Sequence, residues 1–153
     1  MSAARAALPV AGRRTVPLER EEALRLLGSV SLGRVVFTVR ALPAIRPVNH
    51  VLVGEDVVIR THKGAAIASH AGQTGPQGVV VAYEADSIDP QRWLGWSVVV
   101  TGYATLVSDP VALARYRAML QPWVEQTMDY AVRIRTDLVT GIRLVAPGDP
   151  PNL

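Results

Sequence analysis

The sequence contains no cysteine, and this absence excludes several kinds of protein. Without thiols the chain can form neither a disulfide framework nor a thiolate metal site, and we expect a cytoplasmic protein. No apolar run is long enough to span a bilayer, and residues 1–22 lack the continuous apolar segment of a signal peptide. We therefore expect no membrane association.

Lysine is almost absent as well, because Lys63 is the only lysine and every other basic residue is an arginine. The formal net charge is +3, which raises the question of nucleic-acid binding. The arginines are scattered along the chain, however, and form no block of like charge. We expect no nucleic-acid partner, and the solitary lysine calls for its own explanation.

What the sequence does have is the composition of one β-rich domain, with 153 residues of which 49% are hydrophobic. Runs of β-branched residues predict strands, and capping signals predict short helices. The predicted strands are 34–40, 45–53, 57–61, 78–86, 96–108 and 130–145, the last with a turn near Thr136-Asp137, and the predicted helices are 18–27, 63–72 and 110–120. This order favours a mainly β protein with short helices, an antiparallel barrel of six or seven strands. The domain is expected over 18–145, with flexible tails over 1–17 and 146–153.

Two residues interrupt the predicted strands. Pro47 has no N–H for a central ladder, so it marks an edge, a bulge or a place where something other than a strand lies alongside. Gly102, inside the longest strand, indicates a bulge or a bend.

The predicted hairpin of 45–53 and 57–61 gathers cationic and polar side chains at one end. They are Arg46, His50, Arg60, Thr61, His62 and Lys63. The helix that starts at Lys63 would add backbone N–H groups with a partial positive charge. Such a set suits a phosphate, although the solvated end of a hairpin explains the same pattern equally well.

Other chemistries find less support. The three histidines lack the spacing of metal ligands, and no carboxylate accompanies them, so we expect no metal site. The P-loop, G-x-G-x-x-G and G-x-S-x-G motifs are absent from the sequence. Trp93 and Trp96 bracket the start of the longest strand, where they would cap the barrel as core aromatics; alternatively, Trp96 and Ser97 would flank a planar ring.

Several motifs in a fixed order carry a family resemblance. They are LGRVVFT (32–38), RPVNH (46–50), VVIRT (57–61), VVVAYEAD (79–86), GWSVVVTGYATLV (95–107) and RIR…TG (133–141). Over roughly residues 18–145 the chain resembles the pyridoxamine 5'-phosphate oxidase-like superfamily of flavin-binding split β-barrels. It is most similar to the small flavin-binding and nitroimidazole-resistance-like members.

The resemblance implies a homodimer with two flavin mononucleotides (FMN) at the subunit interface, and an oxidoreductase that acts on an unidentified small molecule. Pro47, Val48, Asn49 and His50 would lie along the isoalloxazine ring, with Arg46 in the same basic groove. Arg60, Thr61, Lys63 and Gly64 would hold the phosphate. Trp96 and Ser97 would approach the flavin from the long strand of the same subunit or of its partner. His50 is the one candidate proton donor.

The sequence departs from the family pattern at the phosphate segment. Many similar proteins have T-x-x-G-x-K, whereas here Ala66 occupies the lysine position and Lys63 precedes Gly64. Either Lys63 reaches the phosphate from the preceding residue or the ligand differs. A deazaflavin-dependent reductase and a protein that binds flavin or haem without catalysis are therefore alternative interpretations.

Overall fold

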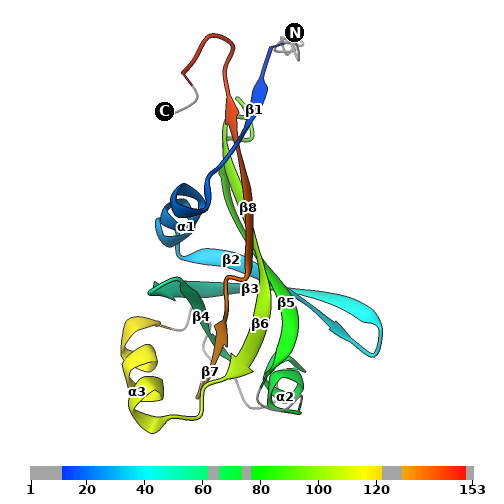
Figure 1. The fold of residues 1–153 in the computed structure, drawn as a ribbon, viewed down its shortest axis with the longest axis vertical. Helices are drawn as coiled ribbons and strands as arrows, with labels where there is room; N and C mark the ends of the chain where they lie inside the picture. Colours follow the sequence, from blue (N-terminus) through cyan, green and yellow to red (C-terminus); the bar gives the residue numbers. More distant parts are fainter. Residues whose placement is uncertain (1–11, 62–65, 74–76, 122–128, 151–153) are drawn as a thin grey trace, which may run out of the picture.

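The computed structural model describes residues 12–61, 66–73, 77–121 and 129–150 (Figure 1). Eight strands and three helices follow one another along this part of the chain. They are β1 (Arg14–Pro17), α1 (Arg20–Gly28), β2 (Leu32–Val39), β3 (Leu42–Val53), β4 (Asp56–Thr61), α2 (Ala66–Gln73), β5 (Val79–Ile88), β6 (Gly95–Leu106), α3 (Pro110–Met119), β7 (Tyr130–Ile134) and β8 (Leu138–Val145). No helix in these ranges is long and apolar enough to cross a bilayer.

Six of the strands form a closed barrel. They follow in the order β6, β5, β2, β3, β4 and β7, and the pairing of β7 with β6 closes the ring. Beyond β6 the sheet continues through β8 to β1, which lie above the barrel in Figure 1. Every described pairing is antiparallel. The predicted antiparallel split barrel with short helices is confirmed, with eight strands in place of six or seven.

β6 belongs to both parts of the sheet, and Gly102 lies where the two parts separate. Residues 95–101 pair with β8, whereas residues 104–106 pair with β7. Between those partners the chain turns at Arg135, whose N–H donates to the Tyr103 carbonyl at 2.9 Å. A Cβ on residue 102 would overlap the Arg135 carbonyl oxygen. Gly102 therefore permits the split of the barrel.

The helices cover different parts of the sheet. Apolar residues of α1 and α2 join the inward-facing residues of the barrel in one core cluster. α3 packs on the outside of β4 and β7, where Tyr116 and Leu120 meet Val58 and Ala131. The described helices therefore cover the interior face and one outer side of the barrel.

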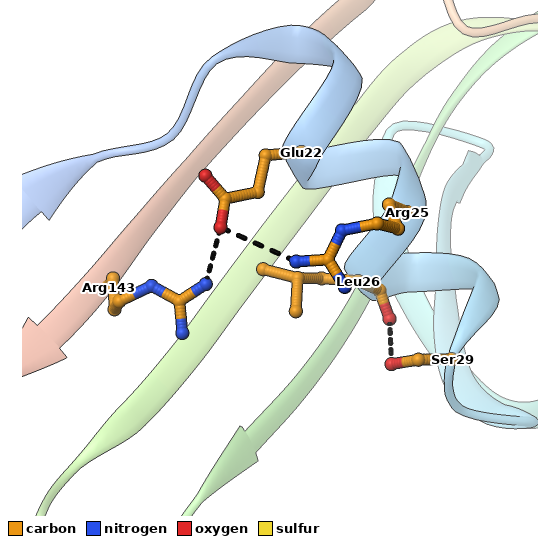
Figure 2. A network of polar contacts seen from close by, with 5 residues as sticks. All are labelled: Glu22, Arg25, Leu26, Ser29 and Arg143. Carbon is orange, nitrogen blue, oxygen red and sulfur yellow. Dashed lines mark hydrogen bonds and ion pairs between the residues drawn. The ribbon is translucent and has the colours of Figure 1, made fainter. Parts of the chain in front are cut away.

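An ion-pair network docks α1 against the sheet (Figure 2). The Glu22 carboxylate accepts a hydrogen bond from Arg143 of β8 at 2.6 Å and one from Arg25 at 3.5 Å. The Arg143 side chain is only 13% exposed, so removal of Glu22 would leave a cation largely shielded from water. At the helix end, the Ser29 hydroxyl donates to the Leu26 carbonyl at 2.6 Å. These contacts fix the point at which the chain enters β2.

The sequence predicts a flexible tail through residue 17, but the structure contains a strand at Arg14–Pro17. This strand pairs with the last residues of β8, from Ile142 to Val145. Its short sequence has no strand pattern of its own, and it forms by adding to the edge of β8. In the predicted C-terminal tail, the Asp149 carbonyl accepts a hydrogen bond from Arg14 at 2.9 Å.

Candidate functional site

β3 and β4 pair at one end and diverge at the other. His50–Val53 pair with Asp56–Ile59 across the turn. Beyond these pairs β4 turns away along β7, while β3 continues beside β2 (Figure 1). In the ranges that the structure describes, no strand pairs with the outer edge of β3 before His50. We call this divergence, between Arg46–Asn49 of β3 and Arg60–Thr61 of β4, the β3–β4 fork.

At the fork, the outer edge of β3 carries backbone groups that pair with no strand in the described residues. The His50 N–H donates to the Ser31 carbonyl at 2.8 Å, so by strand alternation the backbone groups of Val48 also point toward β2. Those of Pro47 and Asn49 point the opposite way, into the fork. Because Pro47 has no N–H, this is a position where proline interrupts no ladder. Pro47 thus lies at an edge, one of the three positions that its residue type predicts.

The side chains of Arg46 and Val48 lie on one face of β3, and those of Pro47 and Asn49 lie on the opposite face. Val48 packs against the core cluster. The Arg46 side chain is exposed, and its guanidinium donates to the neighbouring Ile45 carbonyl at 2.8 Å. Arg46 therefore places a positive charge beside the fork, where it is accessible to an anion from solvent.

Asn49 and Arg60 both donate to the C-terminal end of α3. Arg60 donates to the carbonyl of Leu120 at 2.7 Å and to that of Arg117 at 3.4 Å. The Asn49 side-chain amide donates to the Gln121 carbonyl at 2.5 Å. Burial, and then the nearby Arg117, lower the pKa of Arg60. The sequence predicts a phosphate contact for Arg60, and the structure gives its guanidinium helix carbonyls.

The rest of the predicted phosphate segment is described only in part. Thr61 is buried at the end of β4, opposite Tyr130 in the register with β7. Lys63 and Gly64 lie outside the described residues, and the description resumes with α2 at Ala66.

His50 is held inside the barrel by both ring nitrogens. Its Nε2 donates to the Leu27 carbonyl at 2.8 Å, and its Nδ1 accepts from the Tyr83 hydroxyl at 2.5 Å. The residue is 4% exposed. Gly33 makes room for this pair, because a Cβ there would lie 2.5 Å from the Tyr83 oxygen. The structure thus gives His50 buried hydrogen-bond partners for both ring nitrogens, and its role as a proton donor stays a prediction.

Lowering the pH is expected to destabilise the fold through His50. Burial lowers the pKa of His50 from 6.5, and the bond to Leu27 opposes this more weakly, so the unfolded chain binds a proton that the folded chain excludes. The stabilisation is complete above about pH 6.5 and is lost as the pH falls from there through the folded-state pKa. Urea unfolding between about pH 7.5 and 5 should show this loss, and His50→Gln should reduce it. If the free energy of unfolding falls equally with pH in both proteins, groups other than His50 cause the loss.

Trp96 and Ser97 point to opposite faces of β6. Trp96 is 7% exposed and belongs to the core cluster, as expected for a core aromatic. Ser97 lies on the outward face, between Asp86 of β5 and Ile142 of β8 in the register. Only Ser97 of this predicted pair is therefore placed to meet a second molecule.

A row of mostly apolar residues, which we call the apolar row, crosses the outward face of five strands. In the register it runs Leu138 (β8), Thr101 (β6), Ala82 (β5), Val36 (β2) and Ile45 (β3). The side chains at its two ends, Leu138 and Ile45, are 58% and 59% exposed. α1 and α2 pack on the opposite face, so no described helix covers this one. We call it the uncovered face.

One charged cluster lies on the uncovered face. The Arg34 guanidinium is 3.3 Å from the Glu84 carboxylate and 3.6 Å from that of Asp86. Burial, and then the neighbouring Asp86, raise the pKa of Glu84 to about 7, against the opposing effect of Arg34. Near neutral pH a large fraction of Glu84 is therefore uncharged, which lowers the cost of covering this face.

A groove of about 640 Å³ adjoins the uncovered face where the chain passes from α1 to β2. Its lining combines 28–32 with 50–52, and it includes Arg34 and Asp86. The groove is open to solvent on one side, so a second molecule on the uncovered face would also border it.

Sequence reasoning missed two arrangements in this region. Tyr83 lies in a run of apolar strand residues, and nothing in that run signals its hydroxyl bond to His50. Glu84 and Asp86 occupy alternate positions of β5, a signal that they share the outward face. Nothing local to the sequence signals that Arg34 faces them across the strands.

Comparison with known proteins places these features in context. A family model described as pyridoxamine 5'-phosphate oxidase matches residues 19–145. An uncharacterized protein of Mycobacterium tuberculosis, Rv0080, is 54% identical over 147 residues, which are 96% of this chain and 97% of that protein.

Two solved structures share both sequence and fold with the chain. A FAD-binding protein of Mycobacterium smegmatis is 32% identical, with a TM-score of 0.63, over 85% of this chain and 98% of that one. A candidate pyridoxamine 5'-phosphate oxidase of Corynebacterium glutamicum is 33% identical, with a TM-score of 0.69, over 87% of this chain and 99% of that one.

Proposed function

The chain belongs to the pyridoxamine 5'-phosphate oxidase family, and on this premise we propose that it is a flavin-binding oxidoreductase that acts on a small molecule. The β3–β4 fork carries the proposal. Its backbone edge and the exposed Arg46 lie in the segment that the family resemblance assigns to the flavin. The FAD-binding relative of Mycobacterium smegmatis supports a flavin ligand for this chain.

The residues described at the fork fit such a cofactor. The Asn49 N–H and the Pro47 carbonyl offer a donor and an acceptor to the polar edge of a flat ring. The Arg46 guanidinium offers charge-assisted hydrogen bonds to a phosphate, with Lys63 as the proposed second cation. A bound flavin supplies hydride or electron transfer, while these residues would bind and orient it.

We further propose a homodimer formed through the uncovered face. Its apolar row and its partly protonated Glu84 are suited to burial, and a face shared by two copies fits the two-fold symmetry of most dimers. The partner subunit would then bring its outward-facing Ser97 toward the groove beside Arg34. We propose that the cofactor in the fork then lies close to the subunit interface, as the family resemblance implies.

FMN is the first candidate for the cofactor, since its single phosphate matches the two cations, Arg46 and Lys63, that are proposed to bind it. FAD is the second, and the Mycobacterium smegmatis relative favours it. The absorption spectrum of the purified protein, followed by chromatography of the heat-released ligand, distinguishes the two. A colourless protein that does not change the fluorescence of added FMN, FAD or a deazaflavin coenzyme would refute flavin binding.

Catalysis is tested separately from binding. No acid or base side chain is described at the fork, so we propose that the protein positions the cofactor and shields it while the flavin reacts. Turnover with reduced nicotinamide and a small acceptor supports an enzyme. Tight binding without any turnover over a panel of acceptors would favour a flavin or haem carrier.

Replacing Lys63 is expected to weaken mononucleotide binding selectively. A lysine–phosphate hydrogen bond contributes about 1.5 to 3 kcal/mol, so Lys63→Ala should weaken FMN binding about 10- to 150-fold. Riboflavin lacks the phosphate and should lose little. Fluorescence titration of both ligands measures the two losses, and equal losses would remove the role assigned to Lys63.

A further inference from the structure

Two side chains from opposite arms of the β3–β4 fork converge on the residues that directly follow α3. Asn49 extends from β3 to the Gln121 carbonyl at 2.5 Å. Arg60 extends from β4 to the Leu120 carbonyl at 2.7 Å. The strands that carry them no longer pair with each other at this point. The end of α3 therefore joins the two arms where their own backbones have separated.

The end of α3 is a favourable acceptor for the Arg60 guanidinium. The last carbonyls of a helix have no partner inside the helix, and they carry a partial negative charge. The Arg60 guanidinium matches that charge and also reaches the Arg117 carbonyl at 3.4 Å. Beneath these bonds, the buried side chains of Tyr116 and Leu120 pack against the sheet. Hydrogen bonds and apolar packing thus hold the same end of the helix.

We infer that Asn49 and Arg60 act as a clasp that fixes the C-terminal end of α3, through the two residues that follow the helix, across the fork as one wall of the flavin site. In this role Arg60 is a positioning residue, and the phosphate is bound by other cations. The inference rests on the proposed function, because it needs a flavin in the fork. It departs from the family resemblance, which assigns Arg60 to the phosphate.

Comparison of two ligands tests the clasp. FMN and riboflavin are titrated into apoprotein carrying Arg60→Met, Asn49→Ala or Arg60→Lys, with Arg115→Met, an exposed arginine of α3, as the matched control. The first two variants should weaken both ligands equally, by up to about tenfold, as expected for loss of hydrogen bonds. Arg60→Lys should restore part of the affinity, and Arg115→Met should match the unaltered protein.

Chymotrypsin provides a readout without any ligand. If the clasp holds the turn, cleavage after Tyr116 and Leu120 should be faster in the Arg60→Met and Asn49→Ala apoproteins. Should Arg60→Met fail to fold, Asn49→Ala removes a single bond and carries the same test.

Three results would overturn the inference. A larger loss for FMN than for riboflavin in Arg60→Met would make Arg60 a phosphate ligand. If both variants are cleaved by chymotrypsin at the unaltered rate, the two hydrogen bonds do not hold the end of α3. If they are cleaved faster but bind both ligands with unchanged affinity, the end of α3 is not a wall of the flavin site. Failure of the unaltered protein to bind any flavin would instead defeat the proposed function, and it would be seen before any variant is made.

Discussion

Ala82→Glu is expected to convert the proposed dimer into a monomer that still folds. Ala82 is the central residue of the apolar row, and in a dimer its substituent would be buried on the same face as its neighbour Glu84. A buried and unpaired carboxylate costs about 3 to 5 kcal/mol, which raises the dimer dissociation constant about 150- to 4000-fold. In the single chain the same side chain reaches water, because no described helix covers this face. Sedimentation velocity at several concentrations measures the change.

The matched control is Val111→Glu, at an apolar position on α3 that is 78% exposed and lies away from the uncovered face. It should leave the mass of the assembly unchanged. A dimer that survives Ala82→Glu would move the interface to another surface. A monomeric unaltered protein, with or without flavin, would contradict the dimer itself.

Gly102→Ala is expected to lower the free energy of unfolding by about 3 kcal/mol or more. The new Cβ would overlap the Arg135 carbonyl oxygen and lie 2.9 Å from the Asp137 carboxylate. The Arg135 carbonyl belongs to the backbone corner between β7 and β8, which cannot yield as a flexible side chain does. For a chain of this size the melting temperature should fall by about 6 to 12 °C, as measured by circular dichroism.

Gly54→Ala is the control for the loss of glycine itself. Gly54 has a φ of +63°, but no atom lies within 4 Å of the Cβ position. It should lose about 1 to 2 kcal/mol, because an L residue is disfavoured in that conformation. If Gly102→Ala proved no worse than Gly54→Ala, the close approach to Arg135 would have no energetic weight.

The parts of the fold that were predictable are those specified locally. Asp109 and Pro110 have the residue types of an N-cap and a first helical position, and α3 begins at Pro110. The Asp109 carboxylate accepts a hydrogen bond from the Ala112 N–H at 3.0 Å, as a capping residue should. The β-branched runs likewise predict β2 to β6, and the absence of regular βαβ alternation among them favours an antiparallel barrel.

What could not be predicted depends on partners that are distant in the chain. β1 becomes a strand only because β8 offers an edge to it. The sequence assigns Arg60 to a phosphate from its place in the hairpin and from the family resemblance. The Arg60 guanidinium instead donates to carbonyls at the C-terminal end of α3, which nothing in the sequence places beside it. The buried pair of His50 and Tyr83 has the same origin, since each residue is unremarkable within its own strand.

The edge of β3 at the fork has a consequence for amide hydrogen exchange. The N–H groups of Val48 and His50 face β2 and should exchange slowly, whereas that of Asn49, between them, faces no described strand. Exchange should therefore alternate from residue to residue along the middle of a strand, where uniform protection is the usual pattern. A ligand bound in the fork would slow the exchange of the Asn49 N–H but not that of the Val48 or His50 N–H. The exchange rate of this one amide therefore reports ligand binding without any chromophore.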